Sequence, residues 1–248
     1  MLPLVECVPN FSEGRDQRVI DAITDAIRFT PGADLLHVDI GPAANRTVCT
    51  FTGPPDAVAT AALAAARVAV TRIDMRTHTG AHPRMGALDV CPFVPLQGVD
   101  MAQCVALARS VGAQLAADLG VPVYLYGEAA HRSHRRELAT VRSGEYEGLP
   151  ARMSAPARRP DLGPAEVHPW GASAVGARRI LVAFNVNLNT TDVRIARRIA
   201  VLLRERGRGQ HAGLLQGIRA IGWYIAPFGR CQVSMNLIDH QRTPPHAA

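Results

Sequence analysis

The chain of 248 residues contains no lysine, so all 27 of its lysine-plus-arginine residues are arginines. This absence excludes catalysis through a lysine Schiff base, lysine anchoring of pyridoxal phosphate and a phosphate loop that ends in lysine. Aromatic residues make up only 5% of the chain, and its five cysteines form no CxxC pair. An odd number of scattered cysteines is typical of reduced, mostly buried thiols and not of a disulfide framework.

Long hydrophobic runs are also absent. The most extended alanine- and valine-rich stretch, residues 57–70, is too short to cross a bilayer and contains Arg67. The first residues, MLPLVECVPN, have neither the basic start nor the cleavage pattern of a secretion signal. We therefore expect a cytoplasmic protein without a membrane partner.

The net charge is +6, and the arginine excess favours a ligand that carries carboxylates or phosphates. Nucleic acid is one such ligand. However, the arginines of residues 131–137 and 194–208 recur at helical spacings that suit a solvated face, and few aromatic residues are available for stacking. We expect no nucleic-acid partner.

Apolar periodicity predicts alternating strands and helices. In the first part of the chain it predicts strands at 4–8, 33–40, 47–53, 91–96 and 121–127 and helices at 14–30, 55–74, 100–120 and 131–144. Residues 145–177 are rich in proline and glycine and have little periodicity, which favours a linker or a ligand-facing loop. A second unit with the order β-α-β-β follows, with strands at 178–188, 218–226 and 230–239 and a helix at 190–209.

Residues 78–93, HTGAHPRMGALDVCPF, place His78 and His82 four positions apart. A zinc site would need both imidazoles on one helical face together with a third ligand. Gly80 and Pro83 disfavour a helix here, and no third ligand stands out, so we predict no metal. His82 is then a single imidazole in a constrained loop, either structural or catalytic, with an expected pKa near neutrality.

Seven segments resemble one known family in order and without large gaps, from residue 4 to about residue 239. They are VECVPNFSEGRD (5–16), DIGPAANRTVCTFTGPPDAV (39–58), HTGAHPRMGALDVCPFVPL (78–96), VPVYLYGEAA (121–130), SGEYEGL (143–149), PDLGPAEVHPWGASAVGAR (160–178) and LVAFNVNLNT (181–190). They closely resemble the formiminotransferase domain of glutamate formimidoyltransferases, the folate-dependent enzymes of histidine breakdown. The resemblance implies transfer of a formimidoyl group from N-formimidoyl-L-glutamate to N5 of tetrahydrofolate, which serves as co-substrate without a metal.

The resemblance also implies an α+β fold with two ferredoxin-like α/β sandwich subdomains and folate bound between them. The first subdomain would span residues 1–177, including the folate loop, and the second residues 178–248. Family members continue after a QVSMNLID-like segment with a further helix and strand, so we expect a truncated second subdomain whose first strand is an open edge. A partner chain in a homodimer, a smaller ligand site, or a relative that binds folate without turnover would each account for this.

In the family, the histidine of the HPRMGA segment is catalytic, and this role falls on His82 as general acid and base. Asp39 is our candidate for the carboxylate that fixes the tautomer of His82, or else an Asx-turn residue at a strand end. Asp89 is a second candidate for the same role. The rival functions are a non-catalytic folate-binding or regulatory protein and an enzyme that transfers formyl instead of formimidoyl groups.

The family's folate-contacting stretch resembles residues 163–171, one residue shorter than expected. The implied folate-binding residues are Gly163, Pro164, Ala165, Glu166, Val167, His168, Pro169, Trp170 and Gly171. Trp170 could offer an aromatic surface to the pterin ring or pack against the fold.

Five polar residues in the matched segments are candidates for binding the small-molecule substrates, formiminoglutamate and folate. Arg46 and Arg84 could bind the glutamate carboxylates, or lie on the surface. Asn10 could contact ligand or cap the first helix. Asn185 and Asn187 alternate along a strand and therefore face the same side, where they either line the ligand tunnel or satisfy backbone groups.

Overall fold

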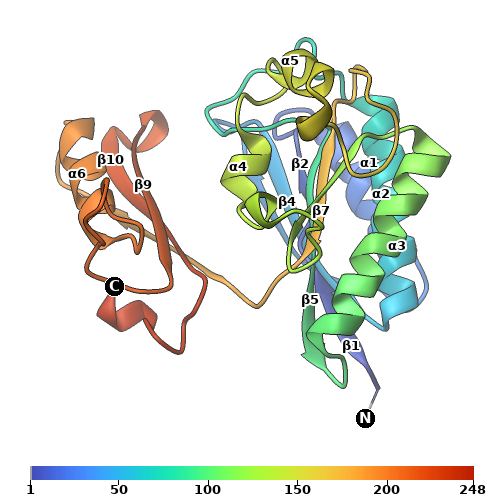
Figure 1. The fold of residues 1–248 in the computed structure, drawn as a ribbon, viewed down its shortest axis with the longest axis horizontal. Helices are drawn as coiled ribbons and strands as arrows, with labels where there is room; N and C mark the ends of the chain where they lie inside the picture. Colours follow the sequence, from blue (N-terminus) through green and yellow to red (C-terminus); the bar gives the residue numbers. More distant parts are fainter. Residues whose placement is uncertain (1) are drawn as a thin grey trace. The chain divides into compact units, whose positions relative to one another are not determined.

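The structure is a computed structural model that describes residues 2–248; Met1 lies outside them. The chain divides into two compact units, Met1–Arg178 and Arg179–Ala248 (Figure 1). Both units combine helices with a mostly antiparallel sheet, so the fold class is α+β, as expected. Within the described residues, no helix is both long enough and apolar enough to cross a membrane.

Seven strands form a single sheet in the first unit. They are β1 (Leu4–Cys7), β2 (Asn10–Phe11), β3 (Asp34–Gly41), β4 (Arg46–Gly53), β5 (Leu88–Gln97), β6 (Val123–Gly127) and β7 (Ser173–Ala177). Since β1 and β2 each pair with both β4 and β5, they are two parts of one interrupted strand. The order across the sheet is therefore β3, β4, β1 with β2, β5, β7, β6. The pairings of β7 with β5 and β6 are parallel, and the others are antiparallel.

Three long helices cover one face of this sheet: α1 (Gln17–Arg28), α2 (Pro55–Arg72) and α3 (Met101–Leu119) (Figure 1). Strand periodicity explains which side chains they bury. In β4, Cys49 and Phe51 are fully buried beneath the helices, whereas the alternate residues Arg46 and Val48 lie on the other face and stay partly exposed. All five cysteines are buried and free, which confirms the expectation of buried thiols.

The other face of the sheet is covered over β6 and β7 by two short helices, α4 (Leu138–Arg142) and α5 (Leu149–Ser154). Tyr124 and Tyr126 of β6 turn toward them and form a second core, while the alternate residues of β6 pack beneath α3. Two 3₁₀ turns, η1 (Ser133–Arg135) and η2 (Pro156–Arg158), flank these helices. On this same face, the side chains of β3 and β4 are only partly covered.

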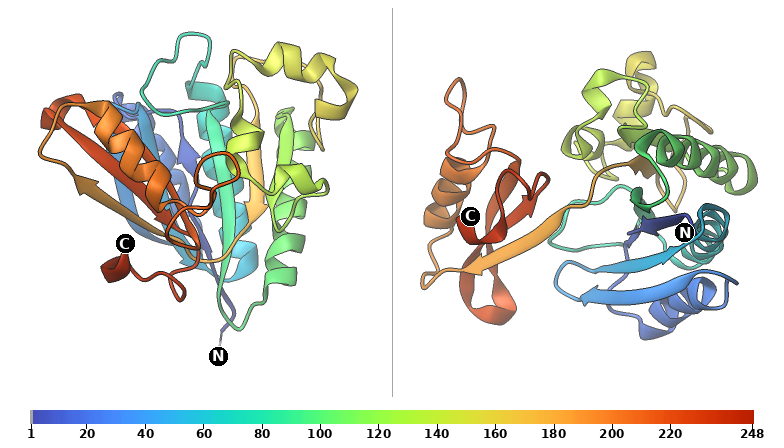
Figure 2. Two further views of the ribbon diagram at one scale, coloured as in Figure 1. Left: turned by 60° about the vertical axis from the view of Figure 1, so that its left-hand side comes forward. Right: turned by 90° about the horizontal axis from the view of Figure 1, so that it is seen from below.

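The second unit has the expected β-α-β-β order. Its elements are β8 (Val182–Asn187), α6 (Val193–Leu203), β9 (Ile218–Ile225) and β10 (Arg230–Leu237), with 3₁₀ turns η3 (Ala226–Phe228) and η4 (Pro245–Ala247). The antiparallel sheet has the order β8, β10, β9, so β8 pairs with β10 alone. Helix α6 packs on one face of this sheet (Figure 2). A Cβ atom on Gly222 would lie 2.2 Å from the Ala196 carbonyl carbon, so glycine permits this close approach.

The prediction of a linker over residues 145–177 is wrong at two places. Residues 173–177 are strand β7 in the interior of the sheet, and residues 149–154 are helix α5. The sequence of β7, SAVGA, is buried on both faces and so shows no alternation of polar and apolar residues. Its small residues and short length hid it from periodicity analysis.

Three other expectations also need correction. The helix predicted at residues 131–144 is divided into η1 and α4, because the backbone at Glu137 is extended and Arg135 turns inward to pair with Asp161. Strand β2 was not predicted, since two residues are too few for a period-two pattern. The strand predicted at 91–96 is β5, which spans ten residues.

The fully buried Phe93 of β5 allows a test of the sheet packing. Phe93→Ala should lower the free energy of unfolding of the first unit by about 3–5 kcal/mol, because it leaves a cavity between sheet and helices. Leu36→Ala, at a side chain that is 60% exposed, is the control and should change it by less than about 0.5 kcal/mol. The first unit contains Trp170 and the second Trp223, so urea unfolding followed by fluorescence in a Trp223→Phe background reports on the first unit alone. Equal effects of the two substitutions would contradict this packing.

Candidate active site

The tight turn between β3 and β4 organises the loop that carries His82. Asn45 closes this turn in the left-handed region, with φ 49°, which asparagine tolerates better than most residues. Its side-chain oxygen accepts from the Gly14 backbone N–H at 2.9 Å, and its side-chain amide donates to the Thr79 carbonyl at 3.0 Å. Its own carbonyl accepts from Nε2 of the buried His78 at 2.9 Å. One residue thus joins three segments that are distant in the sequence.

Gly80 allows this loop to lie directly on the turn. A Cβ atom at position 80 would lie 2.2 Å from the Ala44 carbonyl oxygen, so a side chain there would push the loop away. The Ala81 N–H also donates to the Ala43 carbonyl at 3.1 Å. These contacts bring His82 next to Arg46, the first residue of β4.

Both ring nitrogens of His82 have partners. Nδ1 lies 2.7 Å from the Pro83 carbonyl oxygen, which can only accept, so Nδ1 carries the proton. Nε2 lies 2.8 Å from the Arg46 guanidinium, which can only donate, so Nε2 presents its lone pair. The imidazole is therefore neutral, and its tautomer is fixed by the backbone and an arginine.

The expected near-neutral pKa of His82 is wrong for this geometry. Burial of the ring, followed by the positive charges of Arg46 and Arg142, lowers the pKa of His82 to about 3. The nearest cation faces the very nitrogen that would accept a proton. The free site therefore holds an unprotonated imidazole whose basicity is suppressed.

Charges of both signs surround His82. Burial and the neighbouring Arg142 lower the pKa of Arg46, and the carboxylates of Asp89 and Asp39 act in the opposite direction. Asp89 is buried and forms an ion pair of 2.6 Å with Arg142, and it also accepts from the Met85 N–H at 2.9 Å. Asp89 thus anchors the His82 loop and Arg142 together. We refer to His82, Arg46, Arg142, Asp89 and Asp39 as the His82 cluster.

Asp39 lies on β3, and its backbone is opposite Val48 of β4. Directly opposed residues share a face, so Asp39, Val48 and Arg46 lie on the face away from the long helices. Within residues 2–248, Asp39 forms no hydrogen bond with His82, whose two nitrogens are already engaged, and it acts on the cluster through Arg46. Its predicted role as the tautomer-fixing carboxylate has no support in this geometry, and the Asp89 carboxylate is bonded to Met85 and Arg142 and not to the ring.

Asn10 lies on this same face. It is opposite Val48 on one side and Val90 on the other, and its side-chain amide donates to the Val8 carbonyl at 2.9 Å. Helix α1 is instead capped by Asp16. The helix-capping alternative for Asn10 is therefore wrong, and its contact with ligand stays a prediction.

Arg84 is committed to protein partners, which argues against its predicted role in substrate binding. Guanidinium has five N–H donors. In Arg84 they donate to His78 Nδ1 at 3.2 Å, the His78 carbonyl at 3.0 Å, Glu145 at 3.0 Å, and both carboxylate oxygens of Glu147 at 2.8 and 2.6 Å. No donor is left for a substrate carboxylate. The bond to Arg84 and the bond to Asn45 also account for both nitrogens of His78, which is structural.

The predicted folate loop, residues 163–171, is fastened at both ends. Gly163 and Gly171 have φ of 80° and 69°, a region that favours glycine, and a Cβ on Gly171 would lie 2.2 Å from the Met85 carbonyl oxygen. The Ala87 N–H donates to the Trp170 carbonyl at 2.9 Å. The structure therefore brings this loop against the segment that follows His82.

Trp170 packs against the main core and stacks on His168, with ring centres 4.7 Å apart and planes 9° from parallel. Its indole Nε1 is buried and has no hydrogen-bond partner among the described residues. Without a ligand, Trp170 therefore packs against the fold, as one of the two alternatives predicted. Its indole N–H remains without an acceptor and can donate to a ligand.

In the second unit, Asn185 and Asn187 are exposed on β8, and their register with β10 places both on the face that α6 does not cover. Asn187 accepts from the Gln232 side chain at 2.8 Å, and Gln232 in turn accepts from the Trp223 indole at 3.0 Å. These bonds form a polar row across the three strands. The predicted common face is confirmed.

The main residue that sequence reasoning missed is Arg142. The sequence shows it only as one arginine of a basic segment, while the structure aims it at Asp89 and His82. Its Nε is buried and has no hydrogen-bond partner within residues 2–248. The described residues contain no group of three or more His, Cys, Asp or Glu side chains that could hold a metal ion.

Comparison with known proteins now adds to this geometry. The sequence profile described as "Formiminotransferase domain, N-terminal subdomain" matches residues 4–178, and that described as "Formiminotransferase domain" matches residues 183–248. The chain belongs to the formiminotransferase domain family. The boundary between the two matches falls beside the division between the two compact units of this formiminotransferase chain.

Similar curated proteins carry names of this family. The chain is 54% identical over 248 residues to "Formimidoyltransferase-cyclodeaminase" of Rattus norvegicus, a match that covers 99% of this chain and 46% of that protein. It is 42% identical over 249 residues to "Glutamate formimidoyltransferase" of Thermoplasma acidophilum, covering 100% of this chain and 80% of that protein. For the protein of the same name in Streptococcus pyogenes serotype M1, identity is 40% over 243 residues, covering 98% and 80%.

The formiminotransferase chain therefore spans about half the length of the rat protein and about four fifths of the other two. The match to a solved structure of pitrilysin covers 95% of this chain and 31% of that one, with a TM-score of 0.23 and 9% identity.

The lowered pKa of His82 predicts a pH effect on stability. Between pH 6.5 and about 3, the imidazole is protonated in the unfolded chain and neutral in the folded one. The free energy of unfolding therefore falls as the pH is lowered through this window, by up to about 1.4 kcal/mol per pH unit from this group. His82→Gln removes this contribution, so urea unfolding between pH 7 and 4 should show a smaller loss of stability than in the wild type.

His131→Gln, at an exposed position outside the cluster, is the matched control for losing an imidazole. Parallel pH profiles for His82→Gln and the wild type would contradict the burial of a neutral His82.

Proposed function

We propose that this chain transfers a formimidoyl group from N-formimidoyl-L-glutamate to N5 of tetrahydrofolate, giving 5-formimidoyltetrahydrofolate and glutamate. The observation that carries the proposal is the His82 cluster, a neutral imidazole whose Nε2 lone pair accepts from Arg46 and which lies close to a second arginine, Arg142, in a chain of the formiminotransferase family. The names of the relatives supply the reaction class.

The chemistry needs one proton relay. The N5 amine of tetrahydrofolate attacks the formimidoyl carbon, and a tetrahedral intermediate forms in which N5 carries an extra proton. His82 Nε2 removes this proton and returns it to the glutamate nitrogen, after which the carbon–nitrogen bond to glutamate breaks. A single imidazole can serve as base and then as acid in this sequence, provided that its pKa is close to the working pH.

The donor itself could supply the required rise in pKa. Formiminoglutamate carries two carboxylates, and guanidinium groups pair strongly with carboxylates. We propose that one carboxylate binds Arg46 and draws it away from Nε2, and that the other accepts from the unpartnered Nε of Arg142. The added negative charge then raises the pKa of His82. Binding of the donor would in this way create the base that the reaction needs.

Tetrahydrofolate would bind as co-substrate along residues 163–171, as the family resemblance implies. Two features support this assignment: glycines with positive φ keep side chains out of the loop at both ends, and the loop is bonded to the segment after His82. The unpaired indole N–H of Trp170 could donate to the ligand. Asn10, on the same sheet face as Arg46, and Asn185 and Asn187 of the second unit stay candidates for substrate contacts.

The finer description of the fold belongs to the same proposal. Strands β1 with β2, β3, β4 and β5 and helices α1 and α2 follow the order β-α-β-β-α-β, and their sheet order is that of a ferredoxin-like sandwich, to which α3, β6 and β7 are added. We propose that residues 1–177 and 178–248 are two such subdomains. A homodimer and a cytoplasmic location stay predictions.

The primary test is tetrahydrofolate-dependent turnover of formiminoglutamate. Wild type should turn over, and His82→Ala should lower kcat by at least about a hundredfold, the usual size of an acid–base contribution. His131→Ala is the matched control and should keep wild-type activity, since it lies outside the His82 cluster and the folate loop. Folate binding without turnover in the wild type would contradict the enzyme and favour a binding protein. Turnover of formylglutamate in preference to formiminoglutamate would instead favour formyl transfer.

A second prediction addresses the donor site. Arg46→Gln should raise KM for formiminoglutamate by about tenfold or more, through loss of a charge-assisted bond. It should also move the acidic limb of the kcat/KM profile to higher pH, because loss of the adjacent cation raises the pKa of His82. The matched control is Arg72→Gln at the exposed end of α2. An unchanged KM for formiminoglutamate together with an unshifted limb would refute the role of Arg46.

A further inference from the structure

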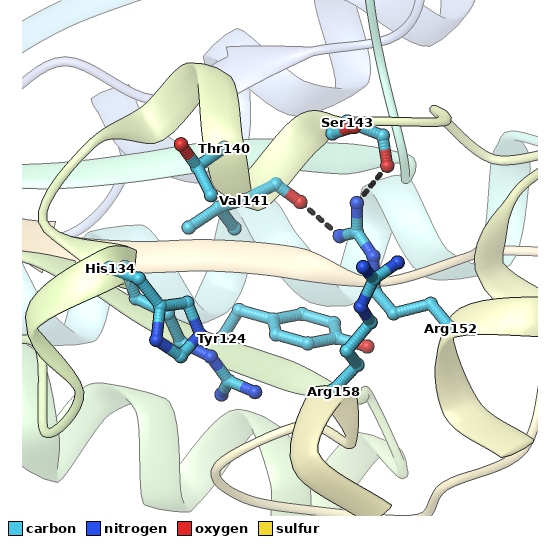
Figure 3. Close-up of a pocket in the computed structure, with 8 residues that line it drawn as sticks. Tyr124, His134, Thr140, Val141, Ser143, Arg152 and Arg158 are labelled. Atoms are coloured by element: carbon cyan, nitrogen blue, oxygen red, sulfur yellow. Dashed lines mark hydrogen bonds between the residues drawn. The ribbon is translucent and has the colours of Figure 1, made fainter. Parts of the chain in front are cut away.

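A second group of basic side chains surrounds a cavity of about 190 Å³ in the first unit (Figure 3). Its walls come from β6, from the segment around η1 and α4, and from the end of α5 with η2. The lining residues are Tyr124, His134, Arg135, Thr140, Val141, Ser143, Arg152 and Arg158. None of these belongs to the His82 cluster or to the folate loop, so the proposed reaction does not use this cavity.

The charges that line the cavity are not balanced. Its lining residues carry three guanidinium groups and no carboxylate, and the nearby Asp161 pairs with Arg135 at 2.5 Å. Burial lowers the pKa of Arg152, the neighbouring Tyr124 hydroxyl acts in the opposite direction, and the positive charges of Arg135 and Arg158 lower it further. Guanidinium groups that are close enough to destabilise one another are stabilised by a shared anion.

Two of the three arginines are held in place by the protein. Arg152 donates to the carbonyls of Val141 and Ser143 at the end of α4, and Arg135 donates to the Arg159 carbonyl in addition to its ion pair. Arg158 is exposed, and its side chain has no hydrogen-bond or ion-pair partner among the described residues. The cavity thus combines a fixed positive wall with one guanidinium that is available to a ligand.

Tyr124 provides an independent sign of a missing partner. Its side chain is 1% exposed, and its hydroxyl is buried without a hydrogen-bond partner in the part of the chain that the structure describes. The guanidinium carbons of Arg135 and Arg152 lie 5.0 and 5.4 Å from its ring centre. Figure 3 shows the hydroxyl end of the ring turned toward Arg152 and Arg158. A buried hydroxyl without a partner is costly and rare, so a ligand atom at this point would remove a penalty.

The chemistry of that ligand follows from the groups around it. Burial raises the pKa of Tyr124, so its hydroxyl is protonated at neutral pH and can donate. Guanidinium groups only donate, and they match the oxygens of phosphate and carboxylate in geometry and charge. The volume suits a compact group of this kind and not a whole nucleotide or folate.

We propose that this cavity is an oxyanion-binding site for a phosphate or carboxylate group, in which Arg158 and Tyr124 donate to the anion and Arg135 and Arg152 supply fixed positive charge. The site is separate from the proposed transferase reaction and does not depend on it.

Calorimetric titration of the full chain with inorganic phosphate, and separately with malonate, tests the proposal and distinguishes the two sources. At least one probe should bind saturably. Arg158→Ala should raise its Kd by about tenfold or more, and Tyr124→Phe by several-fold, as expected for loss of one charge-assisted and one neutral hydrogen bond. Arg158 is exposed, and Tyr124→Phe keeps the buried ring, so both variants should melt within a few degrees of the wild type.

A matched variant and a matched background test the specificity of the effect. Arg67→Ala removes the same charge from the exposed side of α2 and should bind the probe as the wild type does. The titrations are repeated in an Arg46→Gln background, because the proposed donor site beside Arg46 also attracts carboxylates. The proposal is overturned if neither anion binds saturably in that background, or if Arg67→Ala weakens binding as much as Arg158→Ala.

Discussion

The left-handed backbone of Asn45 is the constraint on which the rest of the candidate site depends. Because the chain reverses at this residue, the carbonyl and both side-chain atoms of Asn45 are free to bond His78, Thr79 and Gly14. Those bonds fix the position of the loop that ends at His82, and Arg46 directly follows Asn45 in the chain. The proximity of an imidazole and a guanidinium thus follows from one turn, whose geometry also requires glycine at position 80.

The arginines of this lysine-free chain have different roles. These roles correspond to how many of the five guanidinium N–H donors have a partner within the protein. All five guanidinium donors of Arg84 bond to protein acceptors, so this residue is a structural cross-link. Arg46 and Arg142 have guanidinium donors beside His82 that can still bond a ligand. Because this region is buried, each donor without a partner raises the free energy of the folded protein. Arg158 has all of its donors available. The number of guanidinium donors bonded within the protein therefore distinguishes arginines that stabilise the fold from those that can bind a ligand.

Local patterns in the sequence predicted much of the fold. The long helices and the strands β1, β3 and β4 have apolar periods, β6 is a short run of large apolar residues, and the β-α-β-β order of the second unit followed from the same signals. The break at Gly80 and Pro83 also pointed to a loop-bound His82. Strand β7 could not be found in this way, because a strand buried on both faces has no alternation. The contact of Arg142 with Asp89 and the lowered pKa of His82 depend on tertiary packing, which no single segment encodes.

The position of β7 in the sheet also bears on how the chain is made. Among the strands of residues 2–248, β6 pairs only with β7, which is the last strand of the first unit to leave the ribosome. The strands within residues 4–97, which are β1 with β2, β3, β4 and β5, can pair early and pack against α1 and α2. Strand β6 can pair only after residue 177 has been synthesised. During that interval its apolar side chains and open edge are exposed to other nascent chains. The first unit should therefore fold in two stages during translation, and the vulnerable period is set by the length of the segment that separates β6 from β7.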